Sequence, residues 1–194
     1  MKIVGTDSVE VERALLAGEL RCPVCDGRLS PWGSARERVV RCFGGEQRRR
    51  PRRTLCGVCR VTHVLIWDDT LLRRRDEVTM IGVALTAKAA GRGHRWSAVL
   101  LNVPVSTVRG WLRRFGALVE EIRVWFTVLA HDLDRLLGPV RPQRSVFADA
   151  VEAIGVAARA AVLRVGGRGP WLFASAVTGG RLLSNTGWPW ATIV

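Results

Sequence analysis

The pattern of apolar and polar positions changes character about one third of the way along the chain. Before residue 68 the apolar residues come in short runs, and residues 38–43 (RVVRCF) and 61–67 (VTHVLIW) are typical of strands. After residue 78 they recur at spacings of three and four, which is typical of amphipathic helices. The pattern therefore predicts a mainly α protein with a small β region near its N-terminus.

The first helical stretch predicts three short helices. Residues 79–90 form one helix that ends at a glycine-rich turn, and residues 94–115 form two more, joined at Asn102. Asparagine suits that joint because it adopts the left-handed conformation more readily than most residues. Pro104 is expected to start the third helix, where a missing N–H group is harmless. The spacing is typical of a helix-turn-helix, with these residues inside: Ala98, Leu101, Val103, Val108 and Trp111.

Two longer helices are predicted in the C-terminal third. Residues 117–137 carry a stripe close to a heptad pattern, made of Val119, Ile122, Phe126, Leu129, Leu133 and Leu136. Pro139 and Pro142 break the chain, and Ser145 is a suitable N-cap for a helix that runs to about Val165. We expect a helical hairpin that closes on itself and on the helix-turn-helix. The alternative is that the stripe is the seam of a homodimer, since helix-turn-helix proteins often bind paired half-sites.

The cysteines form a framework with the spacing of metal ligands. Four of the five lie in two CxxC pairs, CPVC at 22–25 and CGVC at 56–59. A CxxC turn places two thiolates on one side of a knuckle, and two knuckles complete the tetrahedral shell of Zn²⁺. We therefore expect a zinc ribbon with one structural zinc ion and no open catalytic position, whose ligands are Cys22, Cys25, Cys56 and Cys59.

Two neighbouring side chains are left outside this ligand set. Cys42 lies on a predicted strand and is expected to be a buried free thiol. His63, four residues after Cys59, could replace a ligand, but a strand histidine is more often packed in the core. Disulfides are disfavoured because they are unusual in the cytoplasm.

The expected organisation has four parts. An N-terminal helix covers residues 1–20, the zinc ribbon covers 21–68, and the helix-turn-helix covers 78–116. The helical hairpin and an apolar, Trp-rich tail, which is expected to pack on the body or on a partner, cover 117–194.

The net charge of +13 is concentrated in two blocks. Residues 36–60 hold nine arginines against Glu37 and Glu46, a net charge of +7. Residues 78–116 hold five arginines and Lys88 with no carboxylate, a net charge of +6. Codon bias would spread arginine evenly, whereas a nucleic-acid surface concentrates it. The placement therefore indicates double-stranded DNA as the partner.

The predicted outer face of the second helix of the helix-turn-helix suits a major groove. Arg109 and Arg113 lie one turn apart, and arginine reads guanine through a bidentate contact. Ser106 and Thr107 can bind phosphate or a base edge. The other residues of this segment expected at the DNA are Val105, Arg92, Arg95 and Arg114. In a loop of the ribbon, five arginines are expected to bind phosphates: Arg48, Arg49, Arg50, Arg52 and Arg53.

The helix-turn-helix resembles those of bacterial transposases and homeodomain-like regulators. The longer string is similar to a family of uncharacterised zinc-ribbon plus helix-turn-helix proteins from high-GC bacteria. The matching pieces, within residues 20–160, are CPVC, PWGSARERVVR, RPRRTLCGVCRVTHVL, GRGHR, STVRGWLRRF and ADAVEAI. Such proteins tend to be encoded near insertion sequences and integrases, so the resemblance implies a connection with mobile elements and no established activity.

The sequence also disfavours several classes of function. No uncharged run is long enough to cross a membrane, and the N-terminus lacks the apolar core of a secretion signal, so a cytoplasmic protein is expected. Catalysis and a small-molecule substrate are not expected, because the acidic candidates lie on predicted helices; they are Asp132, Asp134, Asp149 and Glu152.

The expected function is therefore that of a zinc-stabilised, sequence-specific DNA-binding protein. It would act as a transcriptional regulator or as an accessory factor of a mobile element. Two alternatives stay open. One is the DNA-binding half of a split or degenerate transposase, and the other is a non-catalytic protein–protein adaptor whose basic charge is incidental.

Overall fold

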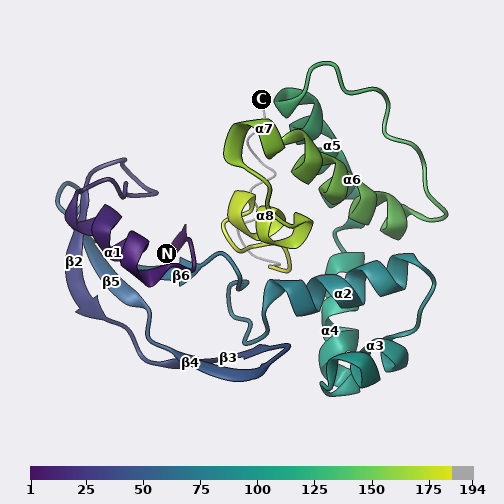
Figure 1. Ribbon diagram of the computed structural model, residues 1–194, viewed down its shortest axis with the longest axis horizontal. Helices are drawn as coiled ribbons and strands as arrows, with labels where there is room; N and C mark the ends of the chain where they lie inside the picture. Colours follow the sequence, from purple (N-terminus) through teal and green to yellow (C-terminus); the bar gives the residue numbers. More distant parts are fainter. Residues whose placement is uncertain (185–194) are drawn as a thin grey trace. The chain divides into compact units, whose positions relative to one another are not determined.

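The computed structural model describes residues 1–184, and the Trp-rich residues 185–194 lie outside the described part (Figure 1). The chain divides into two compact units, Met1–Glu77 and Val78–Val194. The first unit holds a small mixed sheet, and the second holds helices. Within the described part, no helix combines the length and apolar character needed to cross a membrane.

The first unit is built on a four-stranded sheet with the strand order β1-β6-β5-β2. The strands are β1 (Lys2–Val4), β2 (Leu29–Ser34), β5 (Arg52–Cys56) and β6 (Thr62–Trp67). β1 runs parallel to β6, and the other pairs are antiparallel. The segment expected to be one N-terminal helix therefore starts with a strand, because the apolar run Ile3–Val4 completes the edge of the sheet beside β6.

Helix α1 (Ser8–Leu16) follows β1 and is capped by Asp7, whose carboxylate accepts hydrogen bonds from the backbone N–H groups of Val9 and Glu10. Its residue Leu15 is 1% exposed. Leu15 packs into the core cluster of the unit together with Val4, Cys22, Leu29, Cys56 and Leu65. Two cysteines of the CxxC pairs are thus part of the core itself.

The remaining strands, β3 (Arg38–Cys42) and β4 (Gly45–Arg49), form a separate antiparallel pair. β2 leads into β3 and β4 leads into β5, and the backbone N–H of Ala35 donates to the carbonyl of Pro51 between the two pairs. The result is a long two-stranded ribbon, visible in Figure 1 as β2–β5 continued by β3–β4. The predicted loop at 48–53 is consequently the end of one strand and the start of the next.

The second unit begins with α2 (Val78–Ala89), α3 (His94–Leu101) and α4 (Val105–Gly116). Ile81, Ala84 and Leu85 are completely buried, since α2 packs against α3, α4, α6 and α8. Asn102 joins α3 to α4 in the left-handed conformation, with φ 51° and ψ 47°. Pro104 is the N-cap of α4, so the helix begins at Val105, one residue later than expected.

The unit continues with α5 (Val119–Leu133), α6 (Val146–Ala160), α7 (Val162–Val165) and α8 (Pro170–Val177). The rings of Phe115, just before α5, and Phe147, at the start of α6, lie 4.9 Å apart. At the other ends, Asp134 and Ala160 line one cavity. The two helices therefore run in the same direction, and the expected hairpin is wrong. Residues 134–145 run back along the helices, which a connection of this length permits.

The apolar stripe of α5 is used inside the chain. Ile122 and Phe126 are 0% exposed, and α5 packs mainly against α6. Leu136 is 95% exposed but lies beyond the end of α5. The stripe is therefore not a free seam for a dimer in this structure, because its central side chains already fill the core of their own unit.

Candidate metal centre and basic surfaces

The four cysteines of the CxxC pairs come together in the first unit. Their sulfur atoms all lie within 4.8 Å of one another. Cys22 Sγ is 3.7 Å from Cys59 Sγ, and Cys25 Sγ is 3.5 Å from Cys56 Sγ. A tetrahedral zinc site with Zn–S bonds of about 2.3 Å has sulfur–sulfur edges of about 3.8 Å, whereas a disulfide measures about 2.05 Å. The cluster thus fits a metal ion and is consistent with zinc.

Local backbone geometry brings the two knuckles together. Asp26 and Arg60, each one residue after a CxxC pair, adopt positive φ angles of 58° and 59°. Gly27 is enclosed, since a Cβ atom there would lie 2.8 Å from Val58 Cγ2 and 2.9 Å from Cys56 Sγ. The first knuckle can therefore approach the second because residue 27 has no side chain.

The surroundings of the thiols favour deprotonation at part of the site. Backbone hydrogen bonding, foremost from Cys59, lowers the pKa of Cys56 to about 6. The pKa of Cys22 is also lowered: burial opposes this, but hydrogen bonds from the backbone of Val24 and Cys25 prevail. The pKa of Cys59 is raised to about 12, because a backbone hydrogen bond involving Val61 is outweighed by burial and by the neighbouring thiols. A bound cation would stabilise the thiolate forms of these neighbouring cysteines and so reduce the repulsion between their negative charges.

His63 contacts the cysteine cluster, whereas Cys42 lies outside it. His63 is 4% exposed, and its Nε2 lies 3.3 Å from Cys22 Sγ, so it contacts the cysteine cluster without adding a fifth member to it. Cys42 is half-buried at the end of β3, where its thiol donates to the carbonyl of Gly45. The expectation of a buried Cys42 is therefore wrong, because β3 ends and β4 begins at an exposed turn there.

Much of the arginine block of the first unit is paired internally. Arg49 Nη1 lies 2.6 Å from Asp69 Oδ2, and Arg52 Nη2 lies 2.9 Å from Glu12 Oε1. The exposed guanidinium of Arg48 contacts Glu37 at 3.3 Å. These carboxylates come mostly from distant parts of the sequence, so counting charge by segment overestimates the free charge. Within residues 1–184, Arg50 and Arg53 are exposed and make no ion pair.

The basic block of the second unit is different. Arg95, Arg109 and Arg113 are exposed, and the segment 78–116 contains no carboxylate. Arg114 is half-buried and its Nη1 donates to the carbonyl of Gly110, which ties this guanidinium to its own helix. Of the other residues expected at the DNA, Ser106 and Val105 are exposed and Thr107 is half-buried. Arg92 is exposed, with its guanidinium over the ring of Trp96.

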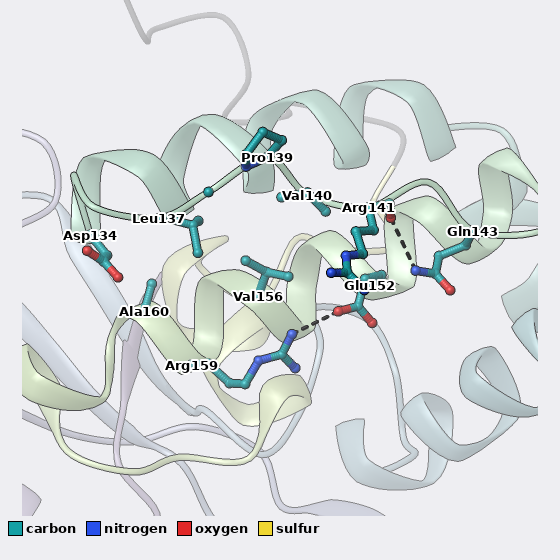
Figure 2. Close-up of a pocket in the computed structure, with 11 residues that line it drawn as sticks. Asp134, Leu137, Pro139, Val140, Arg141, Gln143, Glu152, Val156, Arg159 and Ala160 are labelled. Carbon is teal, nitrogen blue, oxygen red and sulfur yellow. Dashed lines mark hydrogen bonds and ion pairs between the residues drawn. The ribbon is translucent and has the colours of Figure 1, made fainter.

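The acidic residues of the C-terminal third do not converge. Asp134 and Glu152 line one cavity beside the connection 134–145, but Glu152 is paired with Arg159 at 2.8 Å (Figure 2). Asp149 accepts a hydrogen bond from the backbone N–H of Gln143, and Asp132 is exposed. Among the described residues, the cysteine cluster is the one group of three or more metal-ligating side chains.

Comparison with protein-family models, curated proteins and solved structures finds no significant match to this chain.

Proposed function

We propose that this chain is a sequence-specific DNA-binding protein whose first unit is stabilised by zinc. The exposed face of α4 carries the proposal. Arg109 and Arg113 project from it one turn apart, in a segment without a carboxylate that could neutralise them. Such a pair suits guanines in a major groove, where arginine makes bidentate contacts to the O6 and N7 atoms.

The pairing of α3 with α4 supports this role. Ala98, Val108 and Trp111 are buried, and Asn102 makes the sharp left-handed turn between the helices. We interpret α3 and α4 as a helix-turn-helix, in which the second helix enters the major groove. Base contacts are assigned to Val105, Ser106, Arg109 and Arg113, and phosphate contacts to Thr107, Arg92 and Arg95.

In the first unit we assign phosphate contacts to Arg50 and Arg53, with a weaker share for Arg48. Exposed ion pairs such as Arg48–Glu37 are worth little and can exchange partners. Arg49 and Arg52 are withdrawn from the set because carboxylates already hold them. Arg114 is withdrawn too, since it binds its own helix.

Zinc would be held by Cys22, Cys25, Cys56 and Cys59 and would supply free energy of folding to the first unit. We interpret the two knuckles and the strands that follow them as a zinc ribbon. All four ligands are sulfur atoms of this chain, so the metal would have no open position for a substrate. The ribbon would then position Arg50 and Arg53 for the phosphate backbone.

The test is a fluorescence anisotropy titration of duplex DNA selected from a random pool. Affinity should fall with salt with a log–log slope of about −0.9 per phosphate neutralised. Arg109→Ala should lose about 1–3 kcal/mol at one base position and relax specificity there, whereas Arg53→Ala should weaken all sequences alike. Arg13→Ala is the control, because Arg13 is exposed and paired with Glu19.

If the wild-type protein selects no sequence and binds no duplex at low salt, the proposal is wrong. The adaptor then takes its place, and a specific observation favours it. Val99 and Leu100 on α3 are 84% and 54% exposed, an apolar face of the kind that protein partners cover. If DNA binding holds, the resemblance to mobile-element proteins suggests either a regulator or an accessory or split transposition factor, which genomic neighbourhood separates.

A further inference from the structure

A cavity of about 390 Å³ lies within the second unit, between α2, the start of α3 and α8. Its walls include Val83, Ala90, Trp96 and Trp171, and its lining is apolar except for Thr86 and Arg92. The volume is in the range of small-ligand pockets, which are mostly apolar with a few polar groups that orient the ligand. Neither the metal centre nor the exposed arginines of α4 use this cavity.

One wall of the cavity is packed closely against α2. Trp171, in the first turn of α8, lies directly against the backbone of α2 at Gly82. A Cβ atom at residue 82 would lie 2.1 Å from Trp171 Cδ1, so the close approach depends on glycine. The indole is therefore a preformed flat surface, which lowers the entropy lost on binding a flat ligand.

The other indole stands at the rim beside a cation. Trp96 is 45% exposed, and the guanidinium carbon of Arg92 lies 5.5 Å from the centroid of its ring. No carboxylate occurs in residues 78–116, so nothing local neutralises Arg92. The N-cap of α3, Gly93, has no side chain to cap the helix, and the first turn contains no acidic residue. Both features favour an anion at this rim.

We propose that this cavity binds a flat aromatic carboxylate. Its ring would lie against Trp96 and Trp171, and its carboxylate would pair with Arg92 near the start of α3. Aromatic stacking accounts for the ring, and a charge-assisted hydrogen bond accounts for the acid. This site shares Arg92 with the proposed phosphate contacts but uses no residue of α4, and it requires neither DNA nor zinc.

The test is isothermal titration calorimetry of the full chain with 2-naphthoate and with 2-naphthamide, a neutral molecule of the same size. The carboxylate should bind about threefold to tenfold more tightly than the amide. Arg92→Gln should abolish that preference while leaving the amide affinity unchanged. Ala90→Leu, which fills the cavity from an exposed position, should weaken both ligands at least about tenfold.

Ala17→Leu is the matched control, because Ala17, like Ala90, is an exposed alanine directly after a helix. It should bind both ligands like the wild type, and circular dichroism should show that every variant is folded. Equal affinity for carboxylate and amide, or full binding by Ala90→Leu, overturns the proposal. A wild-type protein that binds neither ligand but self-associates also overturns it, when Ala90→Leu prevents the self-association. That result would make the cavity a docking site for a second copy of the chain. DNA is absent throughout, so these outcomes do not decide the proposed function, which the DNA titration with Arg109→Ala tests separately.

Discussion

Two glycines lie beside the cysteine cluster, and their surroundings are opposite. A Cβ atom at Gly27 would come within 2.9 Å of Cys56 Sγ, whereas one at Gly57 would meet nothing within 4 Å. Gly27→Ala should therefore push Cys56 out of the tetrahedral arrangement. We expect at least about a tenfold loss of zinc affinity, as for other changes that displace a ligand's support. Competition against a chromophoric chelator measures it.

Gly57→Ala is the control for this prediction, because it places the same methyl group in the other knuckle. Its zinc affinity should stay close to that of the wild type. Equal affinity for the two variants would mean that the close approach at residue 27 does not determine the metal geometry.

At the scale of single residues, the sequence predicts the clustering of the four cysteines better than it predicts the partners of charged residues. The CxxC spacing is local, so it identifies each half of the cluster from the sequence. The presence of two such pairs indicates that the four cysteines form one group. The partner of Arg49 is Asp69, just after β6, and that of Arg52 is Glu12 on α1, so these pairs form only when the unit folds. The structure therefore leaves fewer arginines of residues 36–60 without a carboxylate partner than the sequence indicates.

The β3–β4 pair offers a test at the scale of one element. Arg49 and Arg48 are neighbours on β4, but the Arg49 side chain is 19% exposed and pairs with Asp69 at 7%, whereas Arg48 is 77% exposed. The Arg49 guanidinium also lies 5.5 Å from the centroid of the Trp67 ring. Arg49→Ala leaves a buried carboxylate unpaired, so it should lower the free energy of unfolding of the first unit by about 2–4 kcal/mol.

Arg48→Ala removes the same charge from an exposed ion pair and should change the stability by less than about 1 kcal/mol. Urea unfolding of each variant, followed by tryptophan fluorescence, measures both changes in the free energy of unfolding. Similar losses for the two variants would contradict an anchoring role for Arg49.

Elements with a regular apolar period were predictable, and their directions were not. The helices of residues 78–133 follow the pattern of spacings of three and four to within a few residues. The sequence does not predict β2, β4 and β5, because LSPWGS, GEQRR and RRTLC contain proline, glycine or paired arginines, which are unfavourable or uncommon in strands. The parallel direction of α5 and α6 is not predictable from the sequence, because residues 134–145 are long enough either to turn or to run back.

For the whole molecule, the two units differ in what holds them together. The core cluster of the first unit includes Cys22 and Cys56 beside four aliphatic residues, so its interior includes part of the candidate metal site. The second unit has a core of its own with completely buried aromatic residues, among them Phe115 and Phe126. Since a small unit with few large apolar residues depends on its metal, zinc should matter to one unit far more than to the other.

Removing the metal should therefore unfold the chain in part. With a strong chelator, amides of residues 1–77 should lose protection against hydrogen exchange, while those of α2, α4, α5 and α6 keep theirs. Helical circular dichroism should largely persist, and added Zn²⁺ should restore protection in the first unit.

The control is a chain with Cys42→Ser, since Cys42 lies outside the cluster and its loss should not alter the response. Unchanged protection in residues 1–77 would show that the apolar cluster holds the sheet without metal, and loss throughout the chain would show that the two units fold as one.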